Sequence, residues 1–199
     1  MNLNESRYTQ YGLVRDMLQT AEIVAKFDPA PARELAGILG KVGRLLMTGE
    51  GSSRIFPAKH AIAHALTHRC PWTLHTEAAR QAWAYDLTDW AVFGLSNSGR
   101  TAEVIGLFDK LRRAGHQHLY SLTAFPDTRL ESLASRGYVL TCGEEGAVAA
   151  TKSVLEQALF YHVLVAEVSG HGERLGPALE DLGAMMTTAM TTELPDDLV

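Results

Sequence analysis

The stretch DWAVFGLSNSGRT, residues 89–101, indicates the class of fold. Its first half is short and apolar, which is typical of a buried strand in a parallel sheet. Its second half, from Ser96 to Thr101, is a turn of small polar residues around Gly99. The next residues, 102–114, are expected to form a helix that Gly115 closes. The stretch therefore predicts a strand, a polar turn and a helix in direct succession.

The same succession recurs on both sides of this stretch. Residues 44–48 are an apolar run that ends in the turn GEGSS, residues 49–53, and a helix is expected from 54 to 68. Strands that alternate with helices imply parallel strands with helices on both faces of one sheet. The other expected strands are 72–75, 118–123 and 138–142, and the other expected helices are 5–27, 32–39, 128–135, 148–168 and 174–188, with a helix or an irregular loop at 77–85.

The composition narrows the classes of protein. The 199 residues carry a net charge of −5, so bulk attraction to nucleic acid is not expected. The N-terminus is polar and no apolar run approaches ~20 residues, so neither a signal peptide nor a membrane-spanning segment is expected. The two cysteines, Cys70 and Cys142, lack CxxC spacing, which favours reduced thiols in a cytoplasmic protein.

Two turns, Gly49–Ser53 and Ser96–Thr101, have the character of an anion site. Each follows a strand and opens a helix, and the N-terminus of a helix offers unpaired N–H groups and the positive end of its dipole. Serines that only cap their helices are the alternative. Two such turns at equivalent strand ends favour anion binding. Neither turn has the GxGxxG or GxxxxGK[ST] pattern, so no dinucleotide or nucleoside triphosphate cofactor is expected.

A third segment, GEEGAVAATKSVLEQ at 143–157, brings charged residues into an apolar helix. Lys152 and Glu156 are four residues apart and therefore neighbours on one helix face. Apolar residues flank Glu156, so we expect a partly desolvated carboxylate whose raised pKa suits proton transfer. A surface ion pair between Glu156 and Lys152 is the alternative.

Three histidines, His60, His64 and His68, recur every four residues on the first helix after a strand. That spacing can build a metal-binding face. No acidic ligand stands between them, so neutral histidines on a helix side are favoured and no metal is expected.

Together the three segments resemble the sugar isomerase (SIS) family. SNSGRT is similar to the family's S-x-S-G-x-T phosphate loop, GEGSS to its first Gly-Ser turn, and EEGAVAATKSVLEQ to a segment of the isomerase part of glucosamine-6-phosphate synthase. The resemblance covers residues 44–168. It implies a three-layer α/β/α sandwich with a five-stranded parallel sheet, of the flavodoxin-like doubly wound type. It also implies a phosphorylated sugar as the ligand.

The resemblance further implies roles for individual residues. In many family isomerases a glutamate on the helix after the last strand moves the proton between C1 and C2, and Glu156 matches that position. Lys152 beside it and His75 near the second strand complete the implied catalytic set. Arg80 stands where the synthase has a histidine from the adjoining subunit, which is a departure from the family. The residues implied to bind the ligand are Ser52, Ser53, Ser96, Asn97, Ser98, Thr101 and Thr128.

The expected organisation is a helical extension at 1–43, a sugar-phosphate-binding domain at 44–190 and a flexible tail at 191–199. The expected activity is aldose–ketose isomerisation of a sugar phosphate, amino sugars included, through an enediol and without a cofactor. A non-catalytic sugar-phosphate sensor and a sugar-phosphate deglycase or deaminase are the alternatives. A homodimer or homotetramer is expected, because the terminal helices are surplus to a five-stranded sandwich and free to pair.

Overall fold

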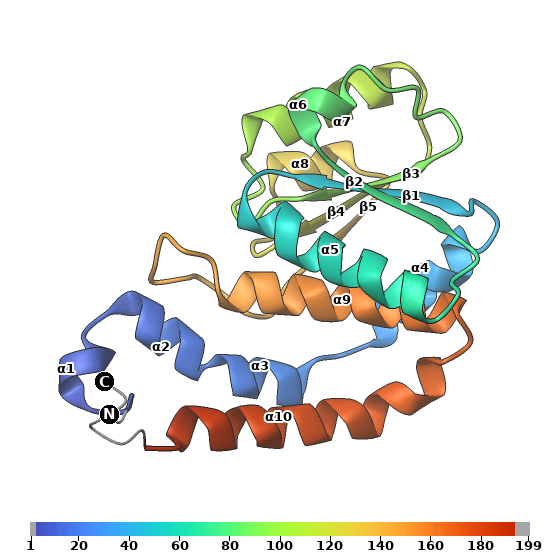
Figure 1. Ribbon diagram of the computed structural model, residues 1–199. Helices are drawn as coiled ribbons and strands as arrows, with labels where there is room; N and C mark the ends of the chain where they lie inside the picture. The colour runs from blue at the N-terminus through green and yellow to red at the C-terminus, as the bar shows by residue number, and fades with distance from the viewer. Residues whose placement is uncertain (1–2, 194–199) are drawn as a thin grey trace.

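The computed structural model describes residues 3–193, and one five-stranded parallel sheet forms its centre (Figure 1). The strands are β1 (Arg44–Gly49), β2 (Thr73–Ala78), β3 (Ala91–Leu95), β4 (Leu119–Thr123) and β5 (Arg136–Val139). Their order is β2-β1-β3-β4-β5, so the order reverses between β1 and β3. Ligands of open α/β sheets bind at such a switch point, beyond the carboxyl ends of the strands.

Helices cover both faces of the sheet, as the alternation of strands and helices predicts (Figure 1). One face carries α4 (Ala30–Leu39), α5 (Ser52–Thr67) and α9 (Lys152–Val168), and the other carries α6 (Ala79–Ala82), α7 (Ala102–Arg113) and α8 (Arg129–Leu133). Each face has its own apolar core, because the strands bury side chains on both sides. The predicted three-layer sandwich is therefore confirmed.

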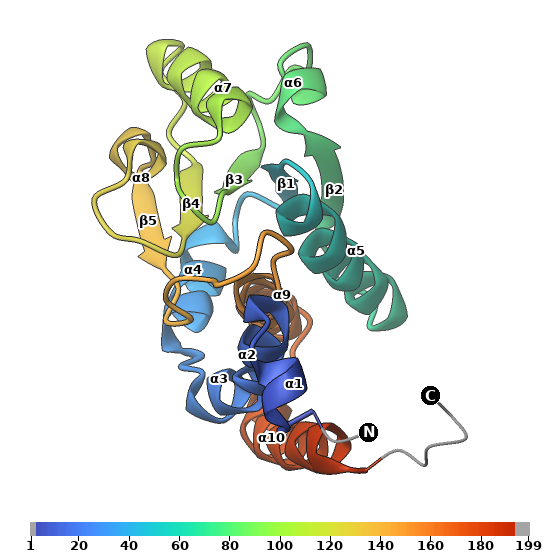
Figure 2. The same ribbon diagram turned by 90° about the vertical axis from the view of Figure 1, so that its left-hand side faces the viewer.

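A further layer of helices lies against α9, on the side away from the sheet (Figures 1 and 2). It consists of α1 (Ser6–Thr9), α2 (Gly12–Leu18), α3 (Thr20–Lys26) and α10 (Leu175–Thr191), which a short 3-10 turn at Gly172–Arg174 precedes. α3 and α10 pack against each other, with Gly183 of α10 next to Ala21 and Ala25 of α3. The terminal helices thus pack on each other within this chain. Within residues 3–193, no helix combines the length and the apolar character needed to cross a bilayer.

Several element boundaries differ from those expected from the sequence; β2, for example, spans Thr73–Ala78 rather than 72–75. The expected helix 5–27 is divided, because Tyr11 is extended and Gly12 then lies against the backbone of Gly146. β5 ends at Val139, because the N–H groups of Thr141 and Cys142 donate to a side chain instead of continuing the sheet. α9 begins at Lys152 rather than near 148, since residues 143–151 form a loop. Most of the expected tail at 191–199 lies outside the described residues.

The packing of Phe93 yields a prediction for the stability of the sheet. Its ring is fully buried in β3, and its centroid lies 5.3–6.2 Å from those of Tyr120, Tyr138, Phe160 and Tyr161. Phe93→Ala should lower the free energy of unfolding by about 3–5 kcal/mol, because the cavity cannot collapse against four rings. In urea unfolding, the exposed Phe56→Ala control should differ from wild type by less than about 0.5 kcal/mol.

Candidate functional site

A cavity of about 370 Å³ lies at the carboxyl ends of β1 and β3, where the order of the strands reverses. Four loops contribute to it: the turn after β1, the turn after β3, the loop after β4 that carries Phe125, and the loop that leads into α9. The first two are the turns for which the sequence predicts an anion site. The lining residues are Glu50, Ser52, Ser53, Leu95, Ser96, Asn97, Ser98, Thr101, Phe125, Glu144, Glu145, Ala147, Val148 and Ala150.

The turn after β3 has its shape because Gly99 adopts a φ of +63°. A Cβ at this position would collide with the side chain of Thr128, so only glycine fits. Across the turn, the hydroxyl oxygens of Ser96 and Thr101 are 2.7 Å apart and hydrogen-bonded. No side chain caps α7, so the N–H groups of its first turn remain available to a ligand.

The turn after β1 lies directly beside it. A Cβ at Gly49 would be 2.8 Å from the carbonyl oxygen of Leu95, so this close approach requires glycine. Gly51 has a φ of +57° and opens α5, which again has no side-chain cap. Ser52 and Ser53 stand in the first turn of that helix and line the cavity. Two uncapped helix N-termini, α5 and α7, therefore border the same cavity.

The N-terminus of α9 also reaches the cavity, but a carboxylate of the chain already occupies it. Glu145 Oε1 accepts hydrogen bonds from the N–H groups of Thr151 and Ser153, at 2.6 and 3.2 Å, and from the Thr151 hydroxyl at 3.3 Å. Its Oε2 accepts from Ser153 Oγ and from Asn97 Nδ2, both at 2.9 Å. Glu145 thus connects the loop before α9 to the turn after β3.

The charge on the lining is negative. Glu50, Glu144 and Glu145 line the cavity, and none of its lining residues is a lysine or an arginine. Glu50 Oε1 accepts a hydrogen bond from the N–H of Ala79 at 3.1 Å. Asn97 Oδ1 is buried and has no hydrogen-bond donor within the described chain. The lining therefore combines N–H and hydroxyl donors with carboxylate acceptors.

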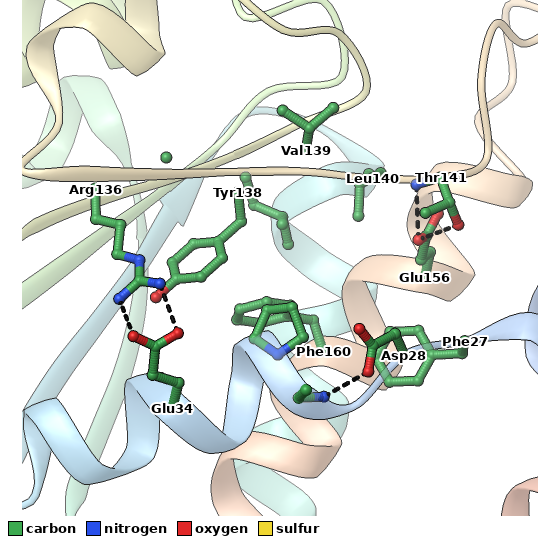
Figure 3. Close-up of a pocket in the computed structure, with 14 residues that line it drawn as sticks. Phe27, Asp28, Glu34, Arg136, Tyr138, Val139, Leu140, Thr141, Glu156 and Phe160 are labelled. Atoms are coloured by element: carbon green, nitrogen blue, oxygen red, sulfur yellow. Dashed lines mark hydrogen bonds and ion pairs between the residues drawn. The ribbon is translucent and has the colours of Figure 1, made fainter.

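Glu156, the expected catalytic base, does not line this cavity. Its carboxylate accepts hydrogen bonds from the N–H and hydroxyl of Thr141, at 2.8 and 2.7 Å (Figure 3). It also accepts one from the N–H of Cys142 at 2.8 Å. It borders a different cavity, of about 560 Å³, beside the edge strand β5. Burial, and then the charge of Glu156, raise the pKa of the Cys142 thiol to about 12. Glu156 thus holds the end of β5 against α9.

Lys152 is turned away from Glu156, so the surface ion pair that was the alternative does not form. Its Nζ lies 3.3 Å from Asp16 Oδ1, and both side chains are almost fully buried. It also donates to Gln19 Oε1 and to the carbonyl oxygen of Glu144, both at 2.9 Å. The ammonium group therefore joins the N-terminal helices to the loop before α9 instead of facing the cavity.

His75 and Thr128 also lie outside the cavity lining. His75 is exposed on the edge strand β2 and borders a separate cavity of about 350 Å³ with Tyr85 and Trp90. Thr128 caps α8, since its hydroxyl accepts from the N–H of Glu131 at 3.2 Å, and it supports the turn at Gly99. Of the expected ligand-binding residues, the other six line the cavity together: Ser52, Ser53, Ser96, Asn97, Ser98 and Thr101.

Glu50 and Glu144 are lining residues that the sequence motifs did not assign to the site. The position of Glu50 inside the turn GEGSS was the signal that could have identified it, because every other residue of that turn is glycine or serine. Glu144 gave no comparable signal. Only the fold of the loop before α9 brings it to the cavity.

Comparison with solved structures identifies proteins of the same fold. The chain superposes on a candidate phosphosugar isomerase from Silicibacter pomeroyi with a TM-score of 0.76 and 19% identity, over 94% of this chain and 58% of that one. For the C-terminal domain of glucosamine-fructose-6-phosphate aminotransferase from Francisella tularensis the TM-score is 0.65 and the identity 16%, over 91% and 55%. For the c3406 protein of Escherichia coli CFT073, in complex with a phosphosugar, the TM-score is 0.60 and the identity 22%, over 96% of this chain and 97% of that one.

These likenesses establish the fold. The resemblance to sugar isomerases that the motifs indicate is thus confirmed at that level. The chain spans 58% and 55% of the length of the first two proteins. No protein-family model and no curated protein sequence matches the chain.

The position of Glu156 generates a prediction. In Glu156→Gln, a neutral amide group would replace the carboxylate that now accepts hydrogen bonds from backbone N–H groups. Hydrogen bonds to a charged group contribute about 1.5–3 kcal/mol each, so the free energy of unfolding should fall by at least about 2 kcal/mol. Glu144→Gln, in which an exposed carboxylate is changed, should stay within about 0.5 kcal/mol of wild type. A Glu156→Gln protein as stable as wild type in urea would contradict this structural role.

Proposed function

We propose that the chain binds a phosphorylated sugar in the cavity between the turns after β1 and β3. The observation that carries the proposal is the convergence of two uncapped helix N-termini, α5 and α7, on one cavity lined with hydroxyl groups. Such termini are suited to a phosphate, because their N–H groups and dipoles stabilise negative charge. The phosphosugar complex of the similarly folded c3406 protein supports this ligand class.

In this proposal, the N-terminus of α9 is closed to the phosphate. Glu145 occupies the start of α9, so a phosphate is directed to Ser52 and Ser53 on one side and to Ser98 and Thr101 on the other. The lining residues include no lysine or arginine that could pair with the phosphate. Backbone N–H groups and hydroxyls therefore supply the recognition.

The carboxylates of the lining favour a ligand that also carries a donor or a positive charge. Glu50 and Glu144 contribute negative charge to the cavity. An amino sugar phosphate, or one conjugated to an amine, would satisfy these groups better than a neutral sugar phosphate.

We further propose aldose–ketose isomerisation of this ligand through an enediol, with Glu50 as the base. Glu50 lines the cavity, and one of its carboxylate oxygens accepts no hydrogen bond from the described residues. A deglycase or deaminase would begin with the same proton transfer. A different observation favours the alternative, a non-catalytic sensor. The carboxylate of Glu145 already accepts five hydrogen bonds. The carboxylate of Glu156 accepts its hydrogen bonds outside the cavity.

A homodimer or homotetramer also belongs to this proposal. α10 leaves Leu182 and Met185 exposed beside an apolar groove between α9 and α10. Closed symmetric pairing of such a face is the commonest solution among soluble oligomers.

Ser98→Ala combined with Thr101→Ala tests the ligand site. Each substitution removes a hydroxyl that would donate to a charged phosphate, worth about 1.5–3 kcal/mol, so affinity should fall at least about 100-fold. Calorimetry with glucose 6-phosphate, glucosamine 6-phosphate and arabinose 5-phosphate measures it, with the exposed Ser132→Ala on α8 as the control. Unchanged affinity in the double variant would place the ligand elsewhere. Tighter binding of glucosamine 6-phosphate than of glucose 6-phosphate would support the proposed preference of the cavity carboxylates for an amino sugar.

Exchange with heavy water tests the reaction. Wild-type protein should introduce deuterium at the carbon next to the carbonyl of the sugar phosphate that binds best. Glu50→Gln should slow this exchange by about 10²–10⁴, the usual contribution of general acid–base catalysis. Glu156→Gln serves as the control and should retain it. Binding without exchange in the wild type would support the sensor and contradict the isomerase.

A further inference from the structure

The loop at 143–151, here called the cavity loop, forms one wall of the site without being a helix or a strand. Glu144, Glu145, Ala147, Val148 and Ala150 of this loop all line the cavity. A segment without regular structure has no hydrogen-bond ladder of its own, so contacts from outside must determine its position. Glu145 provides one such contact, at the end of the loop where α9 begins.

The middle of the cavity loop is held by Asp16, which lies on α2 in the N-terminal extension. Asp16 Oδ2 accepts hydrogen bonds from the N–H groups of Gly146 and Ala147, at 2.7 and 3.1 Å. Asp16 itself is buried, so water does not compete freely for these two donors. A change in the position of α2 would therefore move the backbone of the cavity loop directly.

Lys152 completes this contact from the other end of the loop. Its ammonium group lies 3.3 Å from Asp16 Oδ1 and donates to Gln19 Oε1 on the N-terminal side and to the carbonyl oxygen of Glu144 in the loop. A buried ion pair is tolerable only where further hydrogen bonds satisfy both ions. Asp16 and Lys152 meet this condition, and they do so only when α2 and the cavity loop are in this arrangement.

The backbone allows the same close approach. Gly12, at the start of α2, lies against Gly146, and a Cβ at Gly12 would collide with the carbonyl oxygen of Gly146. The contact is therefore made between two glycines, one in each segment. Asp16, Lys152 and Gln19, together with this glycine contact, are called the clasp below.

We propose that Asp16 is a positioning residue for the ligand site, and that the clasp couples docking of the N-terminal helix α2 to binding of the sugar phosphate. The inference rests on the proposed function for the identity of the ligand. Docked α2 holds Glu144 and Glu145 at the cavity, and a ligand that contacts the cavity loop stabilises the docked state in return. Such coupling is reciprocal by thermodynamic necessity.

The variants must remove the clasp without leaving one buried charge alone. A single substitution can unfold the protein, because an unpaired buried ion is strongly destabilising. The paired variant Asp16→Leu with Lys152→Met replaces both ions with apolar side chains of similar shape, so no acceptor remains for the N–H groups of Gly146 and Ala147. Glu22→Gln is the matched control: it removes a carboxylate from α3 of the same extension, where Glu22 pairs with Lys26 on the exposed surface.

Amide hydrogen exchange gives the first readout and needs no ligand. In the paired variant, peptides covering 143–151 should exchange at least about tenfold faster than in wild type, while peptides covering α7 should be unchanged. Glu22→Gln should match wild type in both. Equal exchange of the cavity loop in the paired variant and wild type would overturn the clasp, whatever the ligand is.

The second readout separates positioning from stability. With glucosamine 6-phosphate as the probe, or whichever of the three sugar phosphates named above binds tightest, the paired variant should bind at least about tenfold more weakly than wild type at a temperature where both are folded. In wild type the ligand should also slow exchange in α2, and in the paired variant it should not. Equal affinity, or no effect of the ligand on α2, would reduce the clasp to a stabilising contact and overturn the coupling. Wild-type protein that binds none of the three would contradict the proposed function and the coupling together, while faster loop exchange would still support positioning by Asp16.

Discussion

The carboxylate of Glu145 is the group on which the arrangement of the site depends. It accepts five hydrogen bonds, from the start of α9 and from Asn97 in the turn after β3. A helix N-terminus that a carboxylate of the chain already satisfies is closed to an external anion. Because the starts of α5 and α7 have no such cap, the structure contains one closed and two open helix N-termini around a single cavity. In the proposed function, an anionic ligand would therefore meet the two serine turns rather than the start of α9.

The same contact links the site to the rest of the chain. Glu145 lies in a loop without regular structure, and Asp16 from the N-terminal extension holds the middle of that loop. Lys152 carries a buried positive charge, and its partners come from α2, from the end of that helix and from the cavity loop. The helices that stand outside the sandwich are thus connected to the cavity through buried polar groups. These polar contacts constrain the orientation of the helices more tightly than apolar contacts would, because hydrogen bonds and ion pairs tolerate little displacement.

The two glycine-containing turns between a strand and a helix were predicted correctly from the sequence because their geometry is local. Gly99 and Gly51 adopt positive φ, the turns around them open helices, and their serines line the cavity. Glu156 shows the opposite case. Its apolar neighbours correctly predicted a buried carboxylate, but its hydrogen bonds to Thr141 and Cys142, just after β5, hold it away from the lining of the ligand cavity. Those two residues precede it by 15 and 14 positions. Helical spacing does not predict which distant loop a side chain of the helix will contact.

The sequence by itself determined the alternation of strands and helices, the parallel sheet and the two serine turns at the strand ends. Each of these follows from local preferences: short apolar runs, glycine where the backbone must turn, and the unpaired groups at the start of a helix. Only the tertiary structure decided which carboxylates face the cavity, that Lys152 pairs with Asp16, and that α2 braces the loop before α9. These contacts join residues up to 136 positions apart (16 and 152), and side chains of the same type could have been paired in several other ways. The packing of the helices against α9 selects one of them, because a buried charge must meet its partner where the fold places it.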